Sequence, residues 1–222
     1  MALTICTWKW GDKYDWGYVA RLQRGVARHL KQPHRFITIS SDELASGHEV
    51  FPIIDRELLD VPGCFARLRM FDPEWQKIIG VDDRLVCLDL DLVVTGPLDP
   101  LFDRPEPYLI LQGANAANPC PFNGSVTMLR AGAHPDVWCD FSLDAADQIP
   151  FHEFPDDQGW IWHKLPAAAG WKAGPESGIY AFGKPGWPKG EALPKGARIV
   201  AFPGSRDPAQ FKHLGWVKEN WR

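Results

Sequence analysis

The sequence has few marks of a secreted or membrane-spanning protein. Its five cysteines are an odd number and form no C-x-x-C pair, so we expect buried free thiols and a reducing compartment. The first residues lack a basic start followed by a sustained apolar stretch, which predicts no signal peptide. No run approaches the ~18 apolar residues that a membrane-spanning helix needs. These absences together predict a cytoplasmic protein.

The sequence also lacks the charge that proteins use to grip nucleic acid. It carries 24 basic and 28 acidic residues, a formal net charge of −4, and no dense basic stripe. Proteins that hold a nucleic-acid backbone usually show a basic excess. The balance therefore argues against nucleic acid as the main partner, although a basic groove assembled by the fold is compatible with it.

The composition is that of a globular chain with many turns. Hydrophobic residues make up 45% and charged residues 23% of the 222 positions, so a substantial core is expected. The 20 glycines and 20 prolines indicate many turns and long connections. The 11 tryptophans either fill the core or offer flat surfaces for stacking on sugars and bases.

The order of apolar segments predicts an α/β fold with a mixed, mainly parallel central sheet flanked by helices. We expect a single domain over 1–222, with halves at 1–105 and 106–208 and a tail at 209–222. Strands are expected at 2–7, 35–40, 48–54, 84–88, 108–113, 125–129 and 198–202, and helices at 15–30, 63–72, 135–147 and 156–164.

The most informative segment is RLVCLDLDLVVTGPLDPLF, residues 84–102, in which a buried strand leads into Asp89 and Asp91. Residues i and i+2 of an extended segment point to the same side. Two neighbouring carboxylates repel each other, and a divalent cation such as Mg²⁺ or Mn²⁺ removes that repulsion and can clamp a diphosphate. Alternatively, one aspartate caps the following turn and the other is merely exposed to solvent.

This segment resembles the core motif of GT-A glycosyltransferases of the glycogenin and bacterial lipopolysaccharide-galactosyltransferase type. Four further stretches resemble the same family in the same order, and the resemblance as a whole covers most of residues 3–208. They are TWKWGDKYDWGYVARLQRGVARHL with RFITISSDE, GCFARLRMF, FNGSVTMLRAG and FPDDQGWI. The resemblance implies a GT-A fold, which is Rossmann-like, and transfer of a hexose from a nucleoside diphosphate sugar to an acceptor hydroxyl.

The resemblance also implies a donor, a metal and roles for individual residues. It suggests UDP as the nucleotide, retention of anomeric configuration and Mn²⁺ or Mg²⁺ as cofactor. Asp91 is expected to be the main metal ligand, with Asp89 touching metal and ribose. Tyr14 and Asp42 are expected against the nucleoside, and Arg67 at the phosphates or the sugar.

Four further residues are expected to hold the donor sugar and orient the acceptor hydroxyl: Asn123, Asp156, Asp157 and Gln158. Asp156 is also a candidate N-cap for the helix that follows, which leaves Asp157 or Gln158 for the sugar. Asn123 alternatively satisfies loop backbone, as Asn often does near Gly. No residue stands out as a general base.

Two of the assigned residues have structural alternatives. Tyr14 is either a donor contact or a packed loop aromatic. Arg67 either meets the donor or pairs with Asp72 or Glu74.

One departure from the family pattern affects the metal. The family carries a histidine in a late H-F-x-G-x-x-K-P segment, and the matching stretch here is RIVAFPGSRDP. Ala201 and Pro203 occupy the two positions where histidine is expected, and neither binds a cation. Arg206 is a candidate for the role of the usual lysine at the diphosphate, and water or His213 is a candidate to complete the metal shell.

Three other functions fit parts of the sequence. A catalytically weakened nucleotide-sugar-binding module is consistent with Ala201 and Pro203. A glycosyltransferase acting on a modified nucleic-acid base is disfavoured by the acidic balance, and a nucleotidyltransferase by the lack of a Gly-rich basic loop after the first strand. The sequence does not indicate the acceptor. Trp216 and Trp221 either form a surface on which the acceptor stacks or pack the C-terminal tail against the core.

Overall fold

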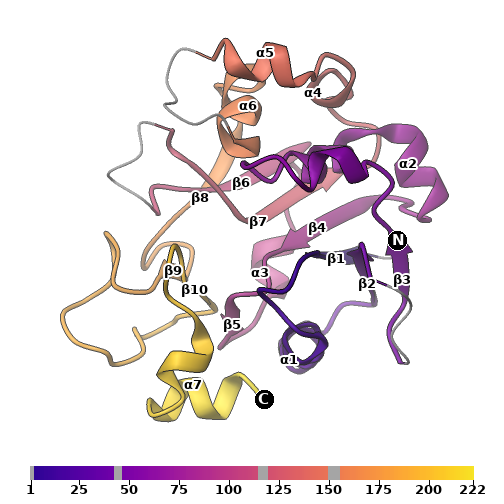
Figure 1. Cartoon of the computed structure of the whole chain (residues 1–222). Coiled ribbons are helices and arrows are strands. Elements are labelled where there is room, and N and C mark those ends of the chain that lie inside the picture. Colours follow the sequence, from indigo (N-terminus) through magenta and orange to yellow (C-terminus); the bar gives the residue numbers. More distant parts are fainter. Residues whose placement is uncertain (1–2, 43–46, 115–119, 150–155) are drawn as a thin grey trace.

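The computed structural model describes residues 3–42, 47–114, 120–149 and 156–222, and it has the expected α/β architecture (Figure 1). A seven-stranded sheet has the order β3-β2-β1-β4-β7-β6-β8. The first four strands in this order are mutually parallel, while β7 is antiparallel to both of its neighbours. Its strands are β1 (Leu3–Lys9), β2 (His34–Ser40), β3 (Val50–Pro52), β4 (Arg84–Leu88), β6 (Tyr108–Gln112), β7 (Phe122–Arg130) and β8 (Ala169–Lys172).

Helices cover both faces of this sheet, with α1 on one face and η2, α4 and α6 on the other (Figure 1). The α-helices are α1 (Trp16–His29), α2 (Pro73–Ile78), α3 (Asp99–Phe102), α4 (Asp136–Cys139), α5 (Leu143–Asp147), α6 (Asp157–Lys164) and α7 (Gly215–Asn220). The 3₁₀ helices are η1 (Arg56–Leu58), η2 (Phe65–Phe71) and η3 (Pro208–Phe211).

Alternation along the central strands builds two separate cores. In β4, Leu85 and Cys87 face the core under η2 and α6, while Val86 and Leu88 face the core under α1. Because both faces are covered, the strand reads as a continuous apolar run, which is why the sequence predicts it to the residue.

A second sheet departs from the prediction. The segment after the aspartates, β5 (Leu92–Val94), pairs antiparallel with β10 (Ile199–Ala201), which pairs parallel with β9 (Ile179–Ala181). The prediction gave one central sheet, with a strand at 198–202, and named no strand at 179–181. Three-residue strands carry too little pattern to reveal a separate sheet, and their partners lie about half the chain away.

Other local predictions are also corrected. The helix expected over 63–72 is a 3₁₀ helix, η2, and Cys64 before it adopts a left-handed conformation (φ 59°). The helix expected over 135–147 is two short helices, α4 and α5. All five cysteines are free, but Cys64 and Cys139 are exposed rather than buried. None of the helices in the described part of the chain has the length and apolar character needed to cross a membrane.

Candidate functional site

The two aspartates follow β4 at the carboxyl end of the parallel strands, the edge where open α/β sheets place ligands. The Asp89 N–H donates to the main-chain oxygen of Ser125 in β7 at 3.0 Å. The main-chain oxygen of Asp91 accepts from the N–H of Phe202 at 3.1 Å, immediately after β10. Asp89 is thus fixed to the large sheet and Asp91 to the small one.

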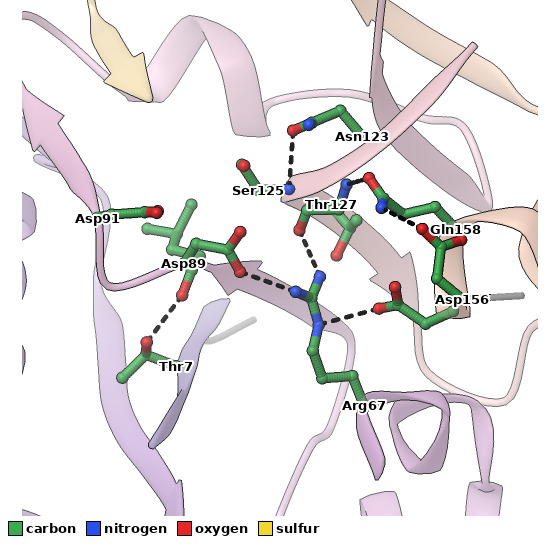
Figure 2. A network of polar contacts seen from close by, with 12 residues as sticks. Thr7, Arg67, Asp89, Asp91, Asn123, Ser125, Thr127, Asp156 and Gln158 are labelled. Atoms are coloured by element: carbon green, nitrogen blue, oxygen red, sulfur yellow. Dashed lines mark hydrogen bonds and ion pairs between the residues drawn. The ribbon is translucent and has the colours of Figure 1, made fainter. Parts of the chain in front are cut away.

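Arg67 is the centre of a buried polar network (Figure 2). Its Nη1 donates to Oδ1 of Asp89 at 2.9 Å, and its Nη2 donates to the main-chain oxygen of Gly124 at 2.6 Å. Its Nε lies 3.2 Å from Oδ2 of Asp157 in an ion pair. The two carboxylates raise the pKa of Arg67 well above its usual value against the opposing effect of burial, so the guanidinium stays charged.

Gly124 makes room for this arginine. A Cβ at this position would lie 2.3 Å from Nη2 of Arg67, so any larger residue would displace the guanidinium. One alternative predicted from the sequence paired Arg67 with Asp72 or Glu74. In the structure Asp72 forms an ion pair with Arg69 instead, with 2.8 Å between Oδ2 and Nη1, and Arg67 pairs with Asp89 and Asp157.

The first turn of α6 supplies the remaining polar groups. Asp156 is the N-cap, with Oδ1 accepting from the N–H of Gly159 at 2.7 Å, as one of the two alternatives predicted. Gln158 accepts from the N–H of Gly124 at 2.8 Å and donates to Oδ2 of Asp156 at 3.0 Å. Asp157 is buried, and burial raises its pKa to about 7 despite the nearby Arg67.

Asp91 has a different environment from Asp89. Its Oδ2 accepts from the hydroxyl of Tyr14 at 3.0 Å, and among the described residues no basic group forms an ion pair with it. Burial and the neighbouring charge of Asp89 raise the pKa of Asp91 to about 7, while the Tyr14 hydrogen bond and Lys13 oppose the rise. Burial and Asp91 raise the pKa of Tyr14 above its usual value, so it remains a donor.

A cavity of about 290 Å³ opens over these side chains. It brings together four of the predicted residues, Tyr14, Arg67, Asp89 and Asp91. Its remaining lining residues were not predicted to belong to the site: Trp8, Trp10, Lys13, Cys64 and Leu90. The loop directly after β1 carries two of them, and its position at the carboxyl end of a parallel strand was the available signal.

Two predicted residues, Asp42 and Asn123, are not among the residues that line this cavity. Asp42 follows β2 and forms an ion pair with the buried Lys9 at the end of β1. Asn123, in β7, accepts from the N–H of Ser125 at 3.1 Å, which matches its predicted alternative of satisfying backbone (Figure 2). Its amide group makes no other side-chain hydrogen bond within the described ranges.

The late segment places no metal-binding side chain at the aspartates. Ala201 pairs with Leu92 and is buried in the core under α1. Arg206 packs against Gly183, where a Cβ would lie 3.2 Å from Nη2, and His213 packs against Phe211. In the part of the chain that is described, neither Arg206 nor His213 forms a hydrogen bond or ion pair with Asp89 or Asp91.

The sequence matches no protein-family model and no curated protein. Solved structures do match in fold. The galactosyltransferase LgtC, in complex with donor and acceptor sugar analogs, superposes with a TM-score of 0.63 at 13% identity over 99% of this chain and 97% of that one. The glycosyltransferase GlyE of Streptococcus pneumoniae TIGR4 superposes with a TM-score of 0.66 at 13% identity over 99% of this chain. The chain spans 63% of GlyE. The expected GT-A fold is therefore confirmed.

Proposed function

We propose that this protein transfers a sugar from a nucleoside diphosphate sugar to an acceptor hydroxyl, with the help of a divalent cation. The observation that carries the proposal is the cavity at the carboxyl end of β1 and β4, where Asp89 and Asp91 meet Arg67 and Tyr14. The fold shared with the galactosyltransferase LgtC and the glycosyltransferase GlyE supports it.

The donor set suits Mg²⁺ or Mn²⁺ held together with a diphosphate. Such ions are usually bound by one or two carboxylates, with water and substrate phosphates completing the shell. Burial and the neighbouring Asp89 raise the pKa of Asp91, and a divalent cation would offset both effects. The described residues contain no group of three or more His, Cys, Asp or Glu placed to hold a metal, so the donor would complete the shell.

Asp89 and Asp91 would hold the metal, which supplies positive charge against the departing diphosphate. Arg67 keeps Asp89 in place, since its guanidinium is held at three points by Asp89, Gly124 and Asp157. Tyr14 orients the carboxylate of Asp91 by donating a hydrogen bond to its Oδ2. A network fixed before the substrate arrives costs little reorganisation when the leaving-group charge develops.

The sugar would lie towards Asn123, Asp157 and Gln158. Gln158 is held by two hydrogen bonds and Asp157 by its ion pair with Arg67. Both side chains are therefore fixed in position, and their role would be to hold the sugar rather than to transfer a proton. Asp42, which follows β2, would contact the nucleoside, and Arg206 would contact the diphosphate. We propose UDP-hexose as donor and retention at the anomeric carbon, in keeping with a fold shared with a galactosyltransferase.

A second candidate is a nucleotide-sugar-binding module without turnover. The observation that favours it is the burial of Ala201 beside β5, which leaves the two aspartates without a third protein ligand from β10. Enzyme and module differ in one measurable product, because only the enzyme releases UDP when it is given a UDP-sugar.

The test is a calorimetric titration of UDP into metal-free protein, with and without Mn²⁺. The variant is Asp91→Ala and the matched control is Asp103→Ala, an exposed aspartate after α3. We expect binding that requires Mn²⁺, is lost in Asp91→Ala and is unchanged in Asp103→Ala. Release of UDP from UDP-sugars is then measured with the wild type.

Two results would contradict the proposal. Tight UDP binding that ignores both Mn²⁺ and Asp91 would favour the module. Failure to bind UDP in any condition would remove the assignment of the donor.

A further inference from the structure

A shallow basic surface lies where α1 meets α7 and the residues around it, and none of its lining residues lines the aspartate cavity. We call it the α1/α7 basic cluster; its members are Arg21, Arg24, Lys212, Lys218 and Arg222. These five side chains and Trp221 line a hollow of about 550 Å³. The clustering is notable because the whole chain carries a net charge of −4.

The cluster has no acidic side chains to neutralise it. None of its five members forms an ion pair with an acidic side chain anywhere in the described ranges. Arg24 donates at 3.0 Å to the carboxyl oxygen of Arg222, the last residue of the sequence shown, so one carboxylate offsets part of the charge and an excess of cations remains. Burial, together with repulsion from Arg222 and Arg24, lowers the pKa of the neighbouring Arg28. The positive charges repel one another, and an anion would relieve this repulsion.

Trp221 holds two of the cations in place. The Arg21 guanidinium lies 4.5 Å and the Lys212 ammonium 5.1 Å from the centre of its ring. The ring of Tyr18 packs edge-on against that of Trp221, with 5.0 Å between the ring centres, and only 5% of Trp221 is exposed. The indole is therefore covered and cannot stack on a base, so this surface can recognise charge but not bases.

Phosphate groups match this surface best. Arginine forks bind phosphate oxygens in pairs, and lysines add mobile point charges. Five cations around one hollow exceed what a single phosphate needs. We propose that the α1/α7 basic cluster is an anion site, separate from the aspartate cavity, that binds a ligand carrying two or more neighbouring phosphate groups. The proposal does not depend on the proposed function.

The test uses inorganic tripolyphosphate as the probe, titrated calorimetrically in EDTA so that a metal-dependent donor site stays empty. The variant Lys212→Glu/Lys218→Glu reverses two exposed cluster lysines. The matched control Lys189→Glu/Lys195→Glu reverses two exposed lysines between β9 and β10 and changes the net charge equally. Thermal unfolding verifies that all three proteins are folded.

We expect the cluster variant to bind tripolyphosphate roughly tenfold or more weakly than the wild type, and the control to bind it as the wild type does. The wild-type affinity should fall with added NaCl because salt screens exposed charges. Absence of binding to the wild type would overturn the proposal. Equal weakening in both variants would also overturn it, because net charge alone would then explain the binding.

A second arm identifies the source of the phosphate. Vesicles of phosphatidylglycerol and phosphatidylcholine are floated with the wild type and with the cluster variant, alongside pure phosphatidylcholine vesicles. Flotation that needs the anionic lipid, is lost in the variant and is displaced by tripolyphosphate assigns the site to lipid headgroups. Tripolyphosphate binding without flotation assigns it to a soluble phosphorylated ligand.

Discussion

The two aspartates of the site lie in opposite electrostatic settings, although one residue separates them. Asp89 faces a guanidinium that is held by three protein groups, and the network around it is complete in the protein alone. Asp91 faces a tyrosine hydroxyl and the negative charge of Asp89, and its pKa rises to about 7. The Arg67 side is held together by contacts within the protein, although burial raises the pKa of Asp157 there as well, whereas none of the basic side chains in the described residues forms an ion pair with Asp91.

This difference predicts that the residues that govern folding stability and the residues that govern ligand binding are different residues of the same site. Groups on the Arg67 side should matter mainly to folding, because breaking a buried ion pair leaves an uncompensated charge. Groups on the Asp91 side should matter mainly to ligand binding, because burial and Asp89 disfavour the charged form of Asp91 and a bound cation would favour it. The following predictions test this division.

The largest effect is expected at Arg67. Replacing it in Arg67→Met leaves Asp89 and Asp157 without their cation, so the free energy of unfolding should fall by about 3–5 kcal/mol, measured by urea denaturation. Arg69→Met is the control, because Arg69 pairs with Asp55 and Asp72 outside the site. That variant should keep Mn²⁺-dependent UDP binding if it folds. Wild-type stability in Arg67→Met would show that the Arg67 side is not a structural unit.

The next effect is expected from binding of the ligand. UDP with Mn²⁺ at a concentration 100 times the Kd should stabilise the wild type by about 2.7 kcal/mol, because only the folded state binds. Thermal unfolding at fixed ligand concentration measures this. Asp91→Ala should show no ligand-dependent shift. An equal shift in that variant would place the ligand elsewhere.

Removing the strained carboxylate should stabilise the free protein. The pKa of Asp91 in the fold is about 7, above the 3.8 of an ordinary aspartate, so its contribution to stability falls as pH rises from about 4 to 7. Asp91→Asn should therefore exceed the wild type by on the order of 2 kcal/mol at pH 8 and match it near pH 4. Denaturation at several pH values measures this. A variant less stable than wild type at pH 8 would contradict it.

The smallest effect is expected at Tyr14. Tyr14→Phe removes one hydrogen bond to Asp91, and that bond lowers the pKa of Asp91. UDP affinity with Mn²⁺ should rise with pH through about 7 in the wild type, and through a higher midpoint in the variant. At pH 7 the loss should be about 1 kcal/mol. Tyr18→Phe, which loses only its bond to Asp207, should keep the wild-type midpoint.

The sequence predicts the parts of the fold that local pattern controls. The run before Asp89 is apolar on both faces and is placed to the residue as β4. The N-cap role of Asp156 is readable because capping depends on nearby residues. The small sheet was missed because β9 and β10 are three residues long and lie far along the chain from β5.

The same limit applies to the site. Asp89 and Asp91 are recognisable because one strand delivers both. The ion pair between Arg67 and Asp157 joins η2 to α6, and nothing local announces it. The exposed basic cluster is equally hidden, because Arg21 and Lys218 meet only in the folded chain.

The bond between Phe202 and Asp91 has a consequence for the order of synthesis. A chain emerging from the ribosome presents β4 and both aspartates well before it has made β10, the strand that pairs with β5. Asp91 therefore stays attached to an unpaired strand until the chain has been made through Ala201. The half of the site around Asp91 is therefore completed only after β10 and Phe202 have been made, so chains that stop before β10 would carry the aspartate pair without the geometry to use it.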